Sequence, residues 1–459
     1  MFFSGGTGFL ERRGFPLSLK KTARGRKETV DRRIQTVRIP IGERVEEVRV
    51  PNLIRVAEPK FIPGVKDPRA EVKRAIMSPI GSRPLREIAS GRKRAVIVVN
   101  DITRPYPGRL MAEEILRELN AAGMRDDQAA LLIAYGQHRE NTPEELEGIY
   151  GRELLGRLKV IHHHAGAPEE NRTVGVTRGG VPVSVNRFYL DADLKILTGC
   201  IAPHQFAGFS GGRKSVIPGI ADIAAVKRHH SFPIRPEKIS LGMLEGNRFH
   251  LEALEAARMT GVDFIVNSVD NAEREMVACV AGDLEQAFYA GVEISRKVWT
   301  VEIPVRPMIV IVSPGGYPRD FDLHQSQKAI GCSELLLPEG GGLILCAECR
   351  DGAGKPGELL RRAKTPDEVI DDFLTNGLRP NGNGKAYMLA RAAKRYSIAL
   401  AGSRIPQGAL REMFLDGYDT VEDAIRVMLE RFGPDAPILA VPHASEIIPV
   451  FTDKQGGEP

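Results

Sequence analysis

The sequence predicts an α/β protein of two α/β domains, the first of them built on a doubly wound, mostly parallel sheet. Short apolar runs typical of buried parallel strands alternate along the chain with amphipathic segments of helical periodicity. The 459 residues are 42% hydrophobic and 27% charged, which is enough apolar surface for two or three globular domains. Polar clusters follow several of the predicted strands, so we expect the active site in a cleft between the two domains.

The first domain is expected over residues 34–300. It opens with two alternating segments, 36–39 and 47–50, which predict the exposed strands of a hairpin that turns near 41–43. A helix is expected over 110–122, and the buried strands are expected over 95–99, 129–135, 158–161 and 194–197.

The second domain is expected over residues 305–432. Its predicted strands are 308–312, 342–346 and 397–401, and its predicted helices are 325–336, 357–363, 385–395 and 421–432. The last apolar run, 437–441, fits a strand of either domain, and we expect residues 433–459 to return the chain to the first.

Polar side chains follow four of the predicted strands of the first domain. Because the carboxyl ends of parallel strands lie at one edge of a sheet, these side chains are expected to meet there. The four clusters are Asp101-Ile-Thr103-Arg104-Pro105, Gly136-Gln-His138-Arg139, His162-His163-His164 and His204.

A glycine-rich segment, Pro203 to Lys214, follows the strand 194–197. Its glycines at 208, 211 and 212 permit a sharp turn or a close approach to a ligand, and free N–H groups in such a loop bind anions. The spacing does not match a Walker A motif. Lys214 is therefore either a phosphate ligand or a reactive amine, unless the segment is only a structural turn.

Charge and cysteine content indicate the compartment and exclude some partners. Residues 1–33 hold nine Lys or Arg against three Asp or Glu, and removing this surplus of six from the net charge of +5 leaves about −1 for the rest. We interpret 1–33 as a flexible basic tail and expect no nucleic-acid partner. No apolar run approaches the roughly 18 residues that span a membrane. Five scattered cysteines indicate a reducing compartment, so the predicted location is the cytoplasm.

Five motifs in this order resemble the nickel-dependent lactate racemase family. They are Asp-x-Thr-Arg-Pro at 101–105, Gly-x-His-Arg at 136–139, the run 203–214, His230, and Gly-Gly-x-Pro-x-Asp with Gln-x-x-Lys over 315–328. Members of that family carry a nickel-pincer nucleotide, a pyridinium-3,5-dithiocarboxylate-type mononucleotide. The resemblance covers about 37–450 and implies a racemase or epimerase that acts on a small 2-hydroxy acid through a 2-keto acid.

The resemblance also implies a role for each site residue. Lys214 would be the covalent tether of the cofactor, and His230 would be the protein ligand of nickel. His138 and His204 would be the paired acid and base groups. The other implied contacts are Asp101, Thr103, Gly211 and Gly212 to the cofactor, and Arg104, Gln325 and Lys328 to the substrate. Enzymes of cofactor synthesis would be transient partners.

Two positions depart from the family pattern as it occurs in lactate-type members. His324 stands where an aromatic residue such as Tyr is expected, and Gly384 stands where a tryptophan can occur. We take these departures to predict a substrate larger than lactate, such as malate or a sugar acid.

Two other function classes stay open at the level of sequence. A zinc-dependent hydrolase could use His138, His204 and His230 as ligands, although the chain has no H-E-x-x-H motif. A non-catalytic carrier of a nucleotide cofactor would need Lys214 but no paired histidines. Whether His162, His163 or His164 joins the site also stays open.

Overall fold

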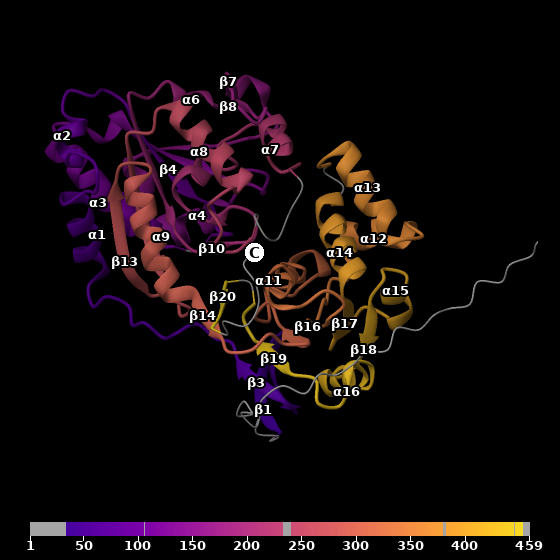
Figure 1. Cartoon of the computed structure of the whole chain (residues 1–459). Coiled ribbons are helices and arrows are strands. Elements are labelled where there is room, and N and C mark those ends of the chain that lie inside the picture. Colours follow the sequence, from indigo (N-terminus) through magenta and orange to yellow (C-terminus); the bar gives the residue numbers. More distant parts are fainter. Residues whose placement is uncertain (1–33, 105, 233–239, 380–381, 445, 453–459) are drawn as a thin grey trace, which may run out of the picture.

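The chain forms two six-stranded sheets, each in its own lobe (Figure 1). The computed structural model describes residues 34–104, 106–232, 240–379, 382–444 and 446–452. The predicted basic tail over 1–33 lies outside these residues.

The first sheet has the strand order β13-β12-β9-β4-β5-β6, and all neighbours are parallel except β12 and β13. This confirms the four strands that the apolar runs predict. The strands are β4 (Ala95–Asn100), β5 (Ala129–Ala134), β6 (Lys159–His162), β9 (Leu194–Cys200), β12 (Phe264–Asp270) and β13 (Met276–Gly282).

Helices cover both faces of this sheet, as a doubly wound fold requires. Along β4, Ile97 faces one cluster of buried side chains and Val98 faces another, because successive residues of a strand point to opposite faces. The first cluster contains residues of α1 (Pro68–Met77), α2 (Leu85–Ala89), α3 (Gly108–Ala121), α4 (Pro143–Tyr150) and α5 (Arg152–Arg157). The second contains residues of α6 (Arg187–Leu190), α7 (Ile223–His229), α8 (Arg248–Thr260) and α9 (Gln286–Trp299).

Short elements complete the first lobe. Two antiparallel pairs lie beside the main sheet, and 3-10 turns connect longer elements. They are β7 (Asn171–Val176) with β8 (Pro182–Asn186), β10 (Pro203–His204) with β11 (Gly208–Phe209), η1 (Asp126–Gln128), η2 (Pro168–Glu170) and η3 (Gly212–Ser215).

The second sheet is entirely parallel, with the order β18-β17-β16-β15-β19-β3. Its strands are β3 (Leu53–Val56), β15 (Ile309–Val312), β16 (Gly342–Cys346), β17 (Ser397–Ala401), β18 (Asp416–Tyr418) and β19 (Ile438–Val441). The helices of this lobe are α10 (Leu323–Ser326), α11 (Lys328–Leu336), α12 (Gly354–Arg362), α13 (Pro366–Asn376), α14 (Asn383–Arg395), α15 (Gln407–Arg411) and α16 (Val421–Phe432).

Both ends of the chain are placed differently from the expectation. The predicted hairpin forms as β1 (Gln35–Ile41) and β2 (Arg44–Val50), but one of its faces is buried against the second sheet beside α16. The strand β19 lies between β15 and β3 in the second sheet, and does not return to the first. Farther on, β20 (Ile448–Phe451) pairs with β14 (Thr300–Ile303) in a separate sheet. Alternation and apolarity predict a strand, but they do not specify which sheet it joins.

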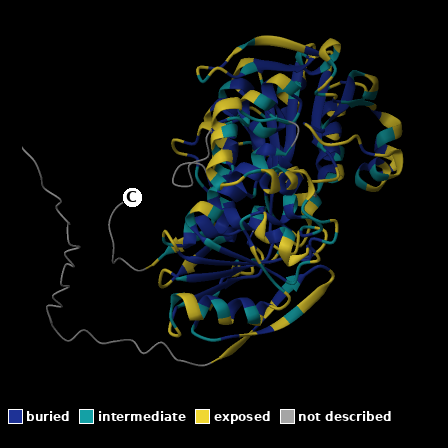
Figure 2. Cartoon of the chain, turned by 90° about the vertical axis from the view of Figure 1, so that its right-hand side faces the viewer, coloured by how far each residue is buried: buried dark blue, intermediate teal, exposed yellow. Residues whose placement is uncertain are grey.

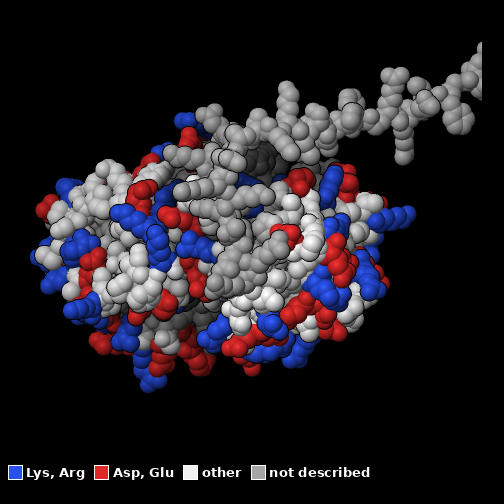
Figure 3. All heavy atoms as spheres, turned by 60° about the horizontal axis from the view of Figure 1, so that its bottom comes forward, with Lys and Arg blue, Asp and Glu red and all other residues white. Residues whose placement is uncertain are grey.

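Burial follows the layers. Figure 2 shows the sheet strands buried inside each lobe and the outer helical surfaces exposed. Figure 3 shows Lys and Arg interspersed with Asp and Glu over the described part of the face in view, which agrees with the near-neutral charge outside the tail. Within the described ranges, no helix combines the length and apolarity needed to cross a membrane.

The packing of the hairpin on the second sheet predicts a large difference between its two faces. Ile39 is fully buried, so Ile39→Ala should lower the free energy of unfolding by about 2–5 kcal/mol through lost contacts and a residual cavity. Val45 is 49% exposed, and the matched control Val45→Ala should change the free energy of unfolding by less than about 0.5 kcal/mol. Chemical denaturation measures both values. Equal effects of the two substitutions would contradict this packing.

Candidate active site

The predicted clusters meet at one edge of the first sheet. The strands β4, β5, β6 and β9 are parallel, so the chain leaves their carboxyl ends on the same side. Asp101, His138 and His204 therefore lie at that edge, as the sequence predicts. Side-chain contacts show which of them form direct pairs.

Asp101 and His138 form a hydrogen-bonded pair. The Nδ1 atom of His138 lies 2.6 Å from Oδ2 of Asp101, and the hydroxyl of Thr103 donates to Oδ1 at 2.7 Å. Asp101 is buried, which by itself would raise its pKa, but His138, Thr103 and Arg104 together lower it. An ionised carboxylate beside Nδ1 keeps the proton on that nitrogen, so the lone pair of His138 is on Nε2.

Within the protein, Asp101 and Thr103 both engage His138 and each other. The contacts to a cofactor that the resemblance implies for these two residues stay predictions. Asp101 orients His138, as the carboxylate of a catalytic Asp–His pair does.

Arg213 fixes the shape of the glycine-rich loop. Its guanidinium is fully buried, lies 4.2 Å from the ring centre of Phe288 and donates to Nδ1 of His250 at 3.0 Å. It also donates to the carbonyl oxygens of Ala207, Ser210 and Gly211. Sequence reasoning missed this role of Arg213.

The glycines of the loop are explained by packing against the protein itself. Gly211 and Gly212 have φ angles of 76° and 51°, which L side chains rarely adopt. A Cβ atom on Gly211 would lie 2.8 Å from the side chain of Ile201. The N–H of Gly212 donates to the side chain of Asn267 at 2.8 Å, so it is not one of the free donors that the anion-cradle hypothesis requires.

His204 is held in one tautomer by the loop. Its Nδ1 accepts hydrogen bonds from the backbone N–H groups of Phe206 and Ala207, each at 3.2 Å. The proton of the neutral ring is therefore on Nε2. Burial and the nearby positive charges of Lys214 and Arg104 hold the pKa of His204 well below its usual value.

His230 is oriented by the helix that it ends. It is the C-terminal cap of α7, and its Nδ1 donates to the carbonyl of Val226 at 3.1 Å, which leaves the lone pair on Nε2. Burial and the charge of Lys214 lower its pKa to about 4, so the ring is neutral near pH 7. The ring of Phe206 lies beside both histidines, with its centre 6.1 Å from that of the His204 ring and 6.5 Å from that of the His230 ring.

Lys214 has the environment of a reactive amine. It lies in η3, directly after the loop that Arg213 fixes. Burial first, and then the charges of Arg104 and Arg213, lower its pKa to about 7. In a large fraction of the protein molecules, the amine of Lys214 is therefore neutral and nucleophilic near pH 7.

The second lobe contributes cations to the same region. Lys328, the first residue of α11, has a pKa lowered to about 8 by burial and by the charge of Arg104 in the first lobe. Asp322 caps α10 and accepts a hydrogen bond from the N–H of Gln325 at 2.7 Å. Lys385, which sequence reasoning missed, lies with its Nζ atom 5.6 Å from the ring centre of Phe206.

Of the two departures from the family pattern, His324 is the one whose side chain is influenced by these cations. Burial, Lys385 and Lys328 lower the pKa of His324 to about 4. A Cβ atom built on Gly384 would lie 2.8 Å from the side chain of Leu378. Enlargement of the substrate pocket by Gly384 stays a prediction.

The three adjacent histidines have partners of their own. The Nε2 atom of the buried His163 lies 2.9 Å from the carbonyl of Ala221, and the side chains of His162 and His164 both pair with Glu140. These contacts account for the three histidines as structural residues, with no role in the reaction. His163 and His164 also line a cavity of about 500 Å³ together with His138.

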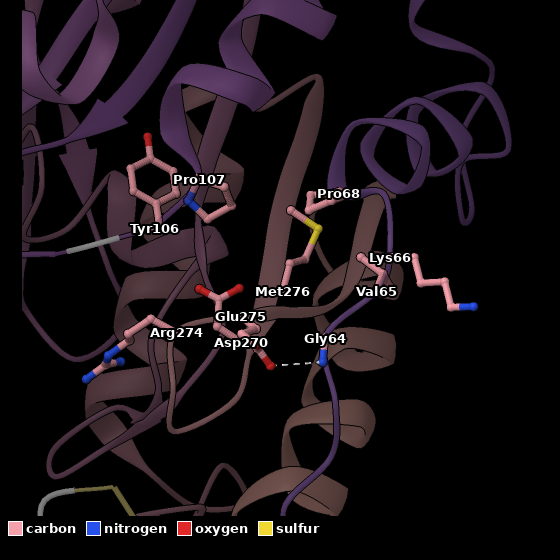
Figure 4. A pocket seen from close by; sticks show the side chains of 10 residues that line it. All are labelled: Gly64, Val65, Lys66, Pro68, Tyr106, Pro107, Asp270, Arg274, Glu275 and Met276. Carbon is pink, nitrogen blue, oxygen red and sulfur yellow. Dashed lines mark hydrogen bonds between the residues drawn. The ribbon is translucent and has the colours of Figure 1, made fainter.

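A second cavity, of about 580 Å³, lies beside the site (Figure 4). Tyr106, from the same connection as Asp101 and Arg104, is on its wall, and the N–H of Gly64 donates to Glu275 there at 3.2 Å. It contains none of the predicted site residues, so its size does not make it the site. Among the side chains that the structure describes, no group of three or more His, Cys, Asp or Glu is arranged to hold a metal ion.

Comparison with known proteins points to one family. The model of the lactate racemase N-terminal domain matches residues 41–242, and that of the lactate racemase C-terminal domain matches 304–448. Lactate racemases of Thermoanaerobacterium thermosaccharolyticum and Lactiplantibacillus plantarum are 31% and 30% identical to the chain over 82% of its length, and it covers 89% and 90% of theirs.

Solved structures agree with these matches. The lactate racemase apoprotein of T. thermosaccharolyticum superposes with a TM-score of 0.81 at 28% identity, over 91% of this chain and 100% of the other. A protein from Thermotoga maritima shares the fold, with a TM-score of 0.63 at 20% identity, over 85% of this chain and all of the other. The two domain models, the two relatives and the racemase structure agree, and the chain belongs to the lactate racemase family of isomerases.

Proposed function

We propose that the protein interconverts the stereoisomers of a 2-hydroxy acid by way of the 2-keto acid. The observation that carries the proposal is the position of Lys214, an amine with a pKa near 7 in the loop between His204 and His230. A nickel-pincer nucleotide, when bound, would supply the acceptor and donor of the hydride at C2.

The residues present fit such a group. Lys214 offers a neutral amine for a covalent link. His230 offers the Nε2 lone pair of a ring whose other nitrogen is bound to a carbonyl, which is the usual arrangement of a metal-ligating histidine. One protein ligand also agrees with the absence of a three-residue metal group among the described side chains, since the cofactor would supply the other donors. Contacts from Asp101, Thr103, Gly211 and Gly212 stay predictions.

His138 is the better base of the two histidines in the state described. With Asp101 bound to its Nδ1–H, its Nε2 accepts the proton of the substrate hydroxyl, and the resulting positive charge lies next to an ionised carboxylate. The neutral ring of His204 carries its proton on Nε2, because Nδ1 accepts two backbone N–H groups, so its Nε2–H donates a hydrogen bond to the oxygen at C2. His138 thus takes the hydroxyl proton of one stereoisomer and returns it to the same oxygen. For the other stereoisomer the roles reverse, which requires the proton of the His204 ring to shift so that Nε2 carries the lone pair.

The cations of the two lobes support binding of an acid. Arg104 matches a carboxylate with two parallel hydrogen bonds, and Lys328 adds a point charge from the other lobe. Gln325 would hold the hydroxyl or keto oxygen. Binding between the lobes also excludes water from the acid and base groups.

The two alternative functions have less support. A zinc hydrolase needs three protein ligands, and the described residues contain no such group. A cofactor carrier has no use for the Asp101–His138 pair. Loading of Lys214 would depend on enzymes that synthesise the nucleotide, which we propose as transient partners.

The first test concerns the tether. Lys214→Ala should lose the covalent mass of the cofactor and all racemase activity, and Lys214→Arg should do the same, because a guanidinium keeps the charge but forms no such link. Intact-mass measurement after co-expression with cofactor-synthesis enzymes reads the first effect. The control Lys394→Ala, an exposed lysine paired with Asp367, should load normally. Normal turnover by Lys214→Ala would remove the basis of the tether.

The second test separates the metal ligand from the proton carriers. His230→Ala should lose nickel, measured by elemental analysis, because Nε2 is the proposed ligand. Asp101→Asn and His138→Ala should keep nickel and lower kcat by about 10²–10⁴-fold, the usual contribution of a general acid or base. Equal loss of nickel in all three variants would instead favour a metal site built from the histidines.

The third test uses pH. Burial lowers the pKa of Lys214 to about 7 and that of Lys328 to about 8, whereas Asp367 raises that of Lys394. Only the neutral amine is acylated, so labelling of Lys214 in the apoprotein should rise as the pH increases through about 7. Lys328 should follow about one pH unit later, and Lys394 should react slowly throughout. Peptide mapping measures the three profiles, and identical profiles would contradict the proposed environment of Lys214.

A further inference from the structure

Lys385 reaches the site from the second lobe. It lies in the first turn of α14, and its Nζ donates to Oε1 of the buried Gln327 at 3.0 Å. The same ammonium lies 5.6 Å from the ring centre of Phe206, the side chain beside His204 and His230. One contact thus holds the side chain of Lys385 within the second lobe, and the other brings it to the glycine-rich loop of the first.

The position of Lys385 in its helix is unfavourable by local rules. The N-terminus of a helix carries a partial positive charge that favours acidic side chains, yet the first turn of α14 contains no acidic residue and holds this lysine. A local rule broken in this way is typical of functional sites. This pattern is also the signal by which the sequence could have revealed Lys385.

Lys385 has no carboxylate to neutralise it within the described part of the chain. No Asp or Glu there forms an ion pair with its Nζ, and its hydrogen bond to Gln327 goes to a neutral amide. Burial, Lys328 and Arg104 lower its pKa to about 7, and Asp322 opposes them only in part. Lys394, on the same helix, pairs with Asp367 and has a raised pKa.

The site therefore holds more cations than a monocarboxylic acid requires. Arg104 and Lys328 suffice for one carboxylate, and Lys214 would be consumed by the covalent link. Lys385 is partly buried and has no carboxylate ion-pair partner among the described residues, so an anionic group of the bound molecule that pairs with it would favour its charged form.

We propose that Lys385 binds a second carboxylate of the substrate, which makes the substrate a 2-hydroxy dicarboxylic acid. This inference rests on the proposed function. The anion that Lys385 meets could in principle also be the phosphate of the cofactor, and the experiment distinguishes the two sources.

The test compares matched pairs of acids on the loaded enzyme. The pairs are malate with 2-hydroxybutyrate, and 2-hydroxyglutarate with 2-hydroxyvalerate, which differ in the terminal carboxylate. The wild-type protein should have the higher kcat/KM for the diacid of at least one pair. Lys385→Met should lower the ratio of diacid to monoacid kcat/KM by about tenfold to a hundredfold, the usual value of a charged hydrogen bond.

Controls make each outcome decisive. Lys394→Met, from the same helix, should leave the ratio unchanged, and Lys385→Arg should restore part of it. Lys385→Gln replaces the Met variant if that one fails to fold. A wild-type preference for both monoacids, or an unchanged ratio in the Lys385 variants, would overturn the inference. So would loss of bound cofactor from these variants, which would assign Lys385 to the phosphate. No turnover of any hydroxy acid by loaded wild-type protein would instead overturn the proposed function.

Discussion

The candidate site depends on the buried guanidinium of Arg213. Its side chain lies on the ring of Phe288 and donates to His250 and to three carbonyl oxygens of the loop 207–211. Burial lowers the pKa of Arg213 to about 9, a cost that these hydrogen bonds offset. Because the loop is held in this shape, His204 lies on one side of it and Lys214 on the other. The chemistry assigned to those two residues thus requires a cation that does not itself react.

Charge links the two lobes at the site. Arg104, from the first lobe, lowers the pKa of Lys328 and of Lys385 in the second. Next to His230, the hydroxyl of Ser231 accepts a hydrogen bond from the N–H of Leu378 at 2.8 Å, so the lobes are also joined directly there. Mutually repelling cations from two lobes leave the site ready for an anion, which would bind both lobes and relieve the repulsion.

The sequence predicts most of the fold and part of the site. Apolar runs locate β4, β5 and β9, and the rule that ligands bind at the carboxyl ends of parallel strands brings Asp101, His138 and His204 together. The pattern does not reveal which sheet a strand joins, so the hairpin is assigned to the wrong lobe and the run 437–441, which forms β19, is left open between the two. It also does not reveal side-chain direction. Gly384 suggests a roomier pocket, which stays a prediction, whereas the adjacent Lys385 is the residue that reaches Phe206 at the site.

The central claim is that the hydrogen at C2 moves as a hydride and never as a solvent-exchangeable proton. Its most direct test is racemisation of a 2-hydroxy acid deuterated at C2 by the cofactor-loaded enzyme in ordinary water. The account predicts that both stereoisomers keep the deuterium at equilibrium, because the His138 and His204 rings carry only the hydroxyl proton. Replacement of the deuterium by solvent hydrogen as racemisation proceeds would show proton abstraction at C2 and would contradict the account.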